Sequence, residues 1–490
     1  MSFSSALFIV YFMPAVLALY WLVPRKAWLQ NTVLLLASYI YYFSYGPKML
    51  GLFVFTALVN YGLLKSLRKP DAEGVPENSK SILRLGLVYN LGQLVLLKYL
   101  GFFASTAAAI AQVLGLSFVP PVLSWGVPIG ISFWTLQLVA YVTDVSYGRR
   151  AGPKSLLDFA TFVAFFPQIL SGPIARGDLI DQLEKPRAPS AERFARGAQA
   201  FLLGFSMKFL VSAFLGPFVD QVYLAPANYT LTAHWLVLYL YTCQIFCDFA
   251  GYSLLALGVA EFFGIGLVEN FRFPFLARNI SDFWKRWHIS LTNFLFDYIY
   301  SPLVTGEGRL RGKLGAGLFI VLLVSGIWHG ATWMFVLWGA LHGFVLMTAH
   351  RWDEYYRTLC RKDRVWVQRR KSRAYVVTSW LLTQGWFMFS LVPFRAPDLK
   401  TAGTFTLGLL GAANGAERIE LGAFSNKLNF LLCMSFVVFY HLSATEPAKR
   451  LRELAARVPA PLRGFAYGTV VVYLFLFKPL SEGSFIYAQF

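Results

Sequence analysis

Charged residues, cysteine and histidine are all scarce in this sequence. Asp, Glu, Lys and Arg together make up 14% of the 490 residues, whereas a soluble domain carries about a quarter. So few charges could not cover the 57% of residues that are hydrophobic. The four cysteines follow neither a metal-binding nor a disulfide-scaffold spacing. These shortages exclude a soluble enzyme, a disulfide-rich secreted scaffold and a disordered protein.

The charges are also unevenly placed, and long stretches have none. Stretches without Asp, Glu, Lys or Arg are residues 1–24, 27–47, 99–143, 221–247, 314–350 and 374–394. Roughly 20 apolar helical residues cross a bilayer core of about 30 Å. The sequence therefore predicts an all-α polytopic integral membrane protein, with its amino terminus kept as the first helix rather than removed as a signal peptide. Crossings are expected near 5–24, 28–46, 49–64, 82–98, 99–118, 122–143, 198–218, 231–260, 314–330, 331–350, 374–394, 428–445 and 464–480.

The net charge of +19 is concentrated in the short breaks between apolar runs. Basic breaks of this kind face the cytoplasm, against the anionic inner leaflet. The most basic break, 351–373, is expected to be a cytoplasmic loop. This distribution indicates contact with membrane lipid and argues against a nucleic-acid partner.

Three further segments are not simple crossings. Residues 156–175 and 282–303 are apolar but interrupted by proline or charge, so we expect re-entrant or interfacial helices that line a cavity. Residues 446–463 are expected to form an interfacial amphipathic helix. No internal repeat is visible, which favours a single membrane-embedded domain over 1–490 and argues against a transporter built from inverted repeats.

Ionisable groups inside membrane segments are costly and therefore mark candidate functional sites. His329 lies 16 residues after Lys313, about 24 Å along a helix, which places it deep in the membrane. A neutral imidazole there could accept a proton from a hydroxyl nucleophile, or it could simply hydrogen-bond between helices. The second candidate, His288, falls in 282–303, where Asp297 and Tyr298 make the segment too polar for a lipid-facing helix.

The remaining polar residues allow two interpretations each. Arg176 ends a broken segment and could meet phosphate groups or extend to the interface. Asp248 is a lone carboxylate in an apolar run, and pairing with an arginine within the fold is favoured over catalysis. His342 is expected to pack between helices, and His234, His350 and His441 to lie near the membrane interface.

Five sequence blocks occur in an order that resembles one protein family. They are "FPQILSGPIAR" (166–176), "ENFRFPF" (269–275), "FWKRWHISL" (283–291), "DYIYSPL" (297–303) and "GIWHGATWMFVLWGALHG" (326–343). Together with the opening residues they are similar to the membrane-bound O-acyltransferase (MBOAT) family, in its alginate O-acetyltransferase branch. The resemblance implies a bundle of about 11–13 transmembrane helices, with re-entrant and interfacial helices around a central cavity.

The same resemblance implies roles for individual residues. His329 would be catalytic and His288 its partner. Apart from the resemblance, we expect Arg176, Asp297, Tyr298 and Trp328 to bind substrate. The carboxyl-terminal residues 483–490 resemble an aromatic motif of cell-envelope acylation systems, in which Tyr487 would carry the acyl group. An interfacial aromatic anchor would explain the same residues.

The resulting hypothesis is an O-acyltransferase of the bacterial inner membrane. Its donor would be a cytoplasmic acyl thioester such as acetyl-CoA, with no bound cofactor and no metal. Its acceptor would be an extracytoplasmic glycan or a periplasmic acyltransferase partner. Two alternatives remain open: D-alanyl transfer from a carrier protein to an envelope polymer, and a non-enzymatic flippase or transporter of an envelope precursor.

Overall fold

The computed structural model describes residues 7–68, 77–119, 126–412, 415–420 and 424–444, with isolated positions at 1, 3, 5 and between 458 and 469. The chain divides into two compact units. The first comprises Met1–Phe201 and Tyr252–Glu269, and the second Leu202–Gly251 and Asn270–Phe490. Throughout the described residues the regular structure is helical, apart from one isolated bridge between Tyr229 and Glu417. The all-α expectation is confirmed.

The first unit is built from the amino-terminal helices. Its helices are α1 (Met13–Leu22, preceded by the π-turn Leu7–Phe12), α2 (Ala27–Phe43), α3 (Pro47–Lys65), α4 (Ser79–Leu94), α5 (Leu100–Val113), α6 (Ile131–Ser146), α7 (Leu156–Ala164) and α8 (Asp178–Leu183). Helix α6 is buried along most of its length. Between α3 and α4, Asn60 and Asn90 exchange amide hydrogen bonds of 3.1 and 2.7 Å, so their buried polar groups are satisfied.

Helices α9 (Ala191–Phe205) and α11 (Leu231–Phe262) contain boundaries between the units. The second unit continues with α10 (Ala213–Leu224), α12 (Ile280–Trp284), α13 (Ile289–Leu295), α14 (Ser301–Thr305), α15 (Leu314–His329), α16 (Trp333–Lys362), α17 (Arg364–Lys371), α18 (Arg373–Arg395), α19 (Leu399–Leu409) and α20 (Phe424–Leu442). Side-chain caps begin several of them. Asn279, Ser372 and Asp398 accept the backbone N–H three residues on, at α12, α18 and α19.

The lengths of the helices test the expected crossings. Five helical runs in the described residues are long and apolar enough to span a membrane: Pro47–Lys65, Ser79–Val113, Ala191–Leu224, Leu231–Phe262 and Trp333–Lys362. Shorter apolar helices cover Leu7–Leu22, Leu314–His329 and Lys427–Leu442. The two crossings expected at 82–98 and 99–118 are instead one 35-residue run, because a π-turn at Val95–Tyr99 continues the helix. The total of 11–13 crossings remains a prediction.

The basic segment 351–373 also differs from expectation. It is not a loop, because α16 continues to Lys362 and α17 follows after a single residue. Ion pairs of Asp353 with Arg357, at 2.5 Å, and with Arg370 satisfy charges along these two helices. The two segments that the sequence marks as interrupted are broken in the structure as well: 156–175 ends its helix at Ala164, and 282–303 breaks into α12, α13, a π-turn (Phe296–Tyr300) and α14. Their re-entrant or interfacial placement stays a prediction.

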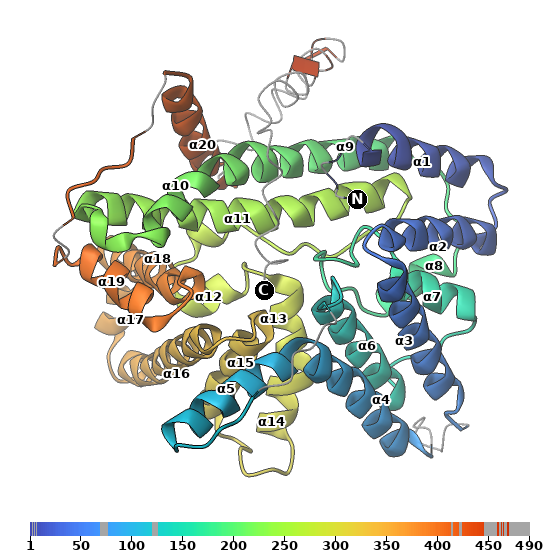
Figure 1. The fold of residues 1–490 in the computed structure, drawn as a ribbon, viewed down its shortest axis with the longest axis horizontal. Helices are drawn as coiled ribbons and strands as arrows, with labels where there is room; N and C mark the ends of the chain where they lie inside the picture. The colour runs from blue at the N-terminus through green and yellow to red at the C-terminus, as the bar shows by residue number, and fades with distance from the viewer. Residues whose placement is uncertain are drawn as a thin grey trace. The chain divides into compact units, whose positions relative to one another are not determined.

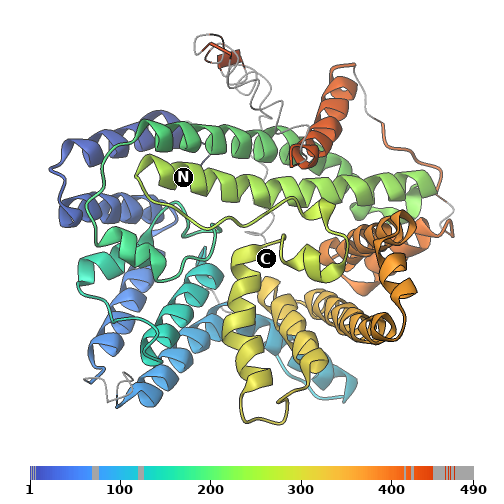
Figure 2. The same ribbon diagram turned by 180° about the vertical axis from the view of Figure 1, so that it is seen from behind.

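The hairpin expected within 314–350 is present as α15 and α16, which run side by side in both views (Figures 1 and 2). Glycines make this close approach possible. A Cβ at Gly326 would lie 2.4 Å from the Phe335 carbonyl oxygen, and one at Gly339 would lie 2.7 Å from the Leu322 carbonyl oxygen. Small residues at such a seam let helix backbones meet directly. The seam fixes the end of α15, where His329 is located.

A buried ion pair joins two of the long helical runs, Ala191–Leu224 and Leu231–Phe262. Lys208, in a π-turn at Ser206–Ser212, donates to the Asp248 carboxylate on α11, and both side chains are at most 9% exposed. The expected partnership of Asp248 is present, but with a lysine rather than an arginine. Gly251 permits the contact, since a Cβ there would lie 2.9 Å from the Lys208 backbone nitrogen.

Two carboxyl-terminal predictions lie outside the described residues. The motif 483–490 with Tyr487 falls wholly outside them, and the amphipathic segment 446–463 almost wholly. Both stay predictions, as does the crossing at 464–480.

Candidate active site

His329 is the last residue of α15, and an aromatic cage encloses its ring. The ring centroid lies 5.0 Å from that of Trp328, 5.1 Å from that of Trp338 and 5.5 Å from that of Phe394. The side chain is buried. Aromatic contacts therefore set the position of this imidazole, and the glycine seam sets the backbone that carries it.

His288 is held in a different way. It precedes α13 with φ 46° and ψ 52°, a left-handed conformation that non-glycine residues adopt at a cost of about 1–2 kcal/mol. Asn270 stabilises this conformation with two hydrogen bonds. Its backbone carbonyl accepts the Ile289 N–H at 2.9 Å, and its side-chain Oδ1 accepts the Ser290 N–H at 3.1 Å. Hydrogen bonds therefore clamp the backbone on the carboxyl side of His288.

The same Asn270 oxygen contacts the imidazole. His288 Nδ1 lies 3.1 Å from Asn270 Oδ1, and the Ser290 hydroxyl donates to that oxygen at 2.9 Å. All three side chains are buried. Among the described residues, His288 Nε2 is buried without a hydrogen-bond partner. Burial also lowers the pKa of His288 well below its ordinary value, so the imidazole is neutral at physiological pH.

The structure brings the two predicted histidines together. Their ring centroids are 6.5 Å apart, and Trp328 contacts both rings, at 5.9 Å from His288 and 5.0 Å from His329. Phe249 also meets the His288 ring edge to face, at 4.5 Å. Two buried imidazoles in an apolar surrounding are suited to proton transfer, because a low local dielectric strengthens each polar interaction.

Three other predicted substrate-binding residues are half-buried, and no contact between them and either histidine is described. Asp297 and Tyr298 lie half-buried on the π-turn Phe296–Tyr300, where Tyr298 packs against Phe294 at 5.0 Å. Arg176 belongs to the first unit and is half-buried. Substrate binding by these three residues stays a prediction, while Trp328 lies against both histidines.

The remaining histidines are more buried than the sequence suggested. His342 lies among Trp338, Trp284 and Trp386, at centroid distances of 4.6, 5.2 and 5.8 Å, which agrees with a packing role. For His234 and His441, the expected position near the membrane interface stays a prediction, and both side chains are buried within the protein. His234 is fully buried against Phe405, and His441 stacks on Phe275.

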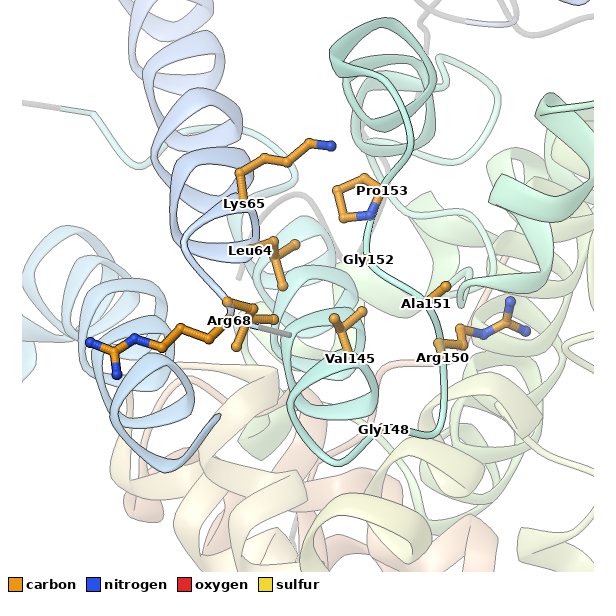
Figure 3. Close-up of a pocket in the computed structure, with 10 residues that line it drawn as sticks. Leu64, Lys65, Arg68, Val145, Gly148, Arg150, Ala151, Gly152 and Pro153 are labelled. Atoms are coloured by element: carbon orange, nitrogen blue, oxygen red, sulfur yellow. The ribbon is translucent and has the colours of Figure 1, made fainter. Parts of the chain in front are cut away.

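A separate pocket of about 420 Å³ lies in the first unit, between the end of α3 and the segment after α6. Lys65, Arg68 and Arg150 line it. In Figure 3 the two guanidinium groups point to opposite sides of the pocket. Arg68 lies 3.6 Å from Glu77, and Arg150 donates to Asp181 at 2.7 Å. Acidic side chains thus neutralise two of the three cations.

Two features of the site bear on sequence reasoning. Within the part of the chain that is described, no three His, Cys, Asp or Glu side chains gather as metal ligands would. Asn270 was not singled out from the sequence, although it stands in the quoted block 269–275. The signal that could have identified it is its uncharged polar side chain next to Phe271, in a block that also contains the charged residues Glu269 and Arg272.

Comparison with known proteins identifies the family. The model of the membrane-bound O-acyltransferase family matches residues 34–387. A "probable alginate O-acetylase AlgI" of Azotobacter vinelandii is 37% identical over 346 residues, covering 70% of this chain and 67% of the relative. Its counterpart in Pseudomonas aeruginosa is 34% identical over 94% of this chain and 87% of the relative. The peptidoglycan O-acetyltransferase of Helicobacter pylori is 30% identical, over 89% and 85%.

Proposed function

Because this chain belongs to the membrane-bound O-acyltransferase family, we propose that it O-acetylates an envelope polysaccharide outside the inner membrane. It is a multi-pass membrane O-acyltransferase. The proposal adds the acetyl group, acetyl-CoA as its cytoplasmic donor, and a glycan or a periplasmic transferase as its acceptor. Relatives named for alginate and peptidoglycan O-acetylation support this choice of substrates.

The observation that carries the proposal is the pair of buried imidazoles, His329 and His288, whose rings lie 6.5 Å apart and both contact Trp328. In the proposed reaction, His329 accepts the proton of the attacking hydroxyl as its oxygen bonds to the thioester carbonyl carbon. The carbon–sulfur bond then breaks, and the proton passes to the leaving thiolate. His288 orients the hydroxyl or stabilises the charge of the transition state.

The test is the O-acyl content of envelope polymers in cells that carry wild type, His329→Ala or His288→Ala at equal membrane abundance. We expect both variants to lower acylation by about 10²- to 10⁴-fold. The mass of the lost group distinguishes acetyl from D-alanyl. The control is His350→Ala, which removes a histidine 3.3 Å from Glu354 on α16 and should leave acylation unchanged. Unchanged acylation in His329→Ala would refute the proposed base.

A further inference from the structure

The hydrogen bonds around Asn270 determine which end of its amide faces His288. A backbone N–H can only donate, so the Asn270 atom 3.1 Å from the Ser290 nitrogen must be the oxygen. The Ser290 hydroxyl donates to the same atom at 2.9 Å. The orientation of this amide therefore follows from its partners rather than from a choice between two equivalent flips.

This orientation decides the protonation of the neighbouring imidazole. An amide oxygen is only an acceptor, so His288 Nδ1, 3.1 Å away, must carry the proton. In a neutral imidazole the other nitrogen, Nε2, then carries a lone pair. That nitrogen is the one that is buried without a hydrogen-bond partner among the described residues.

We propose that Asn270 is a positioning residue that holds His288 as the Nδ1–H tautomer, so that Nε2 accepts a hydrogen bond at the reaction centre. This inference rests on the proposed acyl transfer and refines it. Of the two roles proposed for His288, this tautomer favours orienting the acceptor, because Nε2 without a proton cannot donate to a developing oxyanion. His288 Nε2 accepts a hydrogen bond from a second, neighbouring hydroxyl of a glycan acceptor, and His329 takes the single proton of the attacking hydroxyl.

The backbone strengthens this assignment. The left-handed conformation of His288 costs free energy, and Asn270 offsets that cost through its carbonyl and its Oδ1. Asn270→Leu keeps the backbone bond to Ile289 but removes the acceptor of both His288 Nδ1 and the Ser290 N–H, whereas Asn270→Asp keeps an acceptor oxygen at this place. The tautomer is therefore measured directly, and the two variants are compared.

The first experiment is ¹⁵N NMR of histidine-labelled protein in nanodiscs, with His288→Gln used to identify the His288 signals. Wild type should show a proton on Nδ1 and none on Nε2. Asn270→Leu should shift this population, whereas Asn270→Asp should keep it, since a carboxylate also accepts. A wild-type His288 protonated on Nε2 would overturn the inference. This readout does not depend on acyl transfer, so it stands or falls separately from the proposed function.

The second experiment measures transfer of labelled acetyl from acetyl-CoA in membrane vesicles across pH. Asn270→Leu should lower the rate by about 10- to 100-fold, the usual effect of losing a partner that orients a histidine. Asn270→Asp should restore most of it. Its carboxylate raises the pKa of His288, so the fall in rate on acidification should begin at a higher pH than in wild type.

The matched control is Asn90→Leu, which removes a buried amide from the first unit. It should lower stability without changing the His288 tautomer. Equal rates and equal pH profiles for the wild type and both Asn270 variants would overturn the positioning role. Loss of acylation in His288→Ala alongside that result would leave the proposed function standing.

Discussion

The two histidines of the site differ in the contacts that are described around their rings. His288 lies on a broken segment, in a strained backbone conformation, and hydrogen bonds to Asn270 determine its orientation. His329 ends a regular helix and is enclosed by Trp328, Trp338 and Phe394. A hydrogen bond fixes a tautomer as well as a position, whereas ring packing fixes mainly a position. The contrast matches a division of labour in which His288 keeps one protonation pattern and His329 exchanges its proton.

Removing one wall of the aromatic cage should have the largest effect of the substitutions that spare both histidines. Trp338→Ala should cost about 3–5 kcal/mol of unfolding free energy, because it leaves a cavity beside His329. The rate of acyl transfer per folded protein should fall as well. Trp338→Phe keeps a ring in place and should retain most of both. Equal losses in the two variants would argue that shape is not what positions His329.

A substitution in the glycine seam between α15 and α16 should have the next largest effect. Gly339→Ala would place a Cβ 2.7 Å from the Leu322 carbonyl oxygen, so α15 and α16 must separate, at about 1–3 kcal/mol. Thermal unfolding in detergent should show the loss of stability. Acyl transfer should fall because His329 is displaced, whereas the tautomer of His288 should not change. Gly385→Ala on α18 is the control, since nothing lies within 4 Å of its added Cβ. If both substitutions behave alike, the seam does not hold His329.

The smallest expected effect falls on the hydrogen-bonded side. Ser290→Ala removes one of three donors to Asn270 Oδ1 and keeps the backbone N–H donor. We expect a loss of about 0.5–1.5 kcal/mol in unfolding free energy and a smaller fall in acyl transfer than Asn270→Leu causes. Chemical denaturation and the vesicle assay measure the two. A Ser290→Ala defect as large as that of Asn270→Leu would move the positioning role to the hydroxyl.

The same contrast explains what could be predicted from the sequence. Hydrophobic runs predicted the helical architecture and the α15–α16 hairpin, because the hydropathy of a segment depends only on its own residues. Motif blocks predicted that His288 and His329 belong to one site. The partners were not predictable in the same way: Asn270 lies 18 residues from His288, and Lys208 lies 40 residues from Asp248. Such pairings depend on how broken segments fold back on the rest of the chain, and the spacing of hydrophobic residues does not predict this.

One expected boundary was wrong. The helix does not end between 82–98 and 99–118, because no residue there stops it and a π-turn continues it. The contacts of His234 and His441 could not be predicted for the reason given above: each ring packs against an aromatic ring from a distant segment, Phe405 and Phe275.

The Lys208–Asp248 pair has a consequence for how the protein is made. A charge at the centre of a lone transmembrane helix opposes its insertion into lipid, and here each of two long helices carries one. Neutralisation requires the second helix, whose charge follows 40 residues later in the chain. Pairing of the two helices therefore lowers the free-energy cost of placing both charges in lipid.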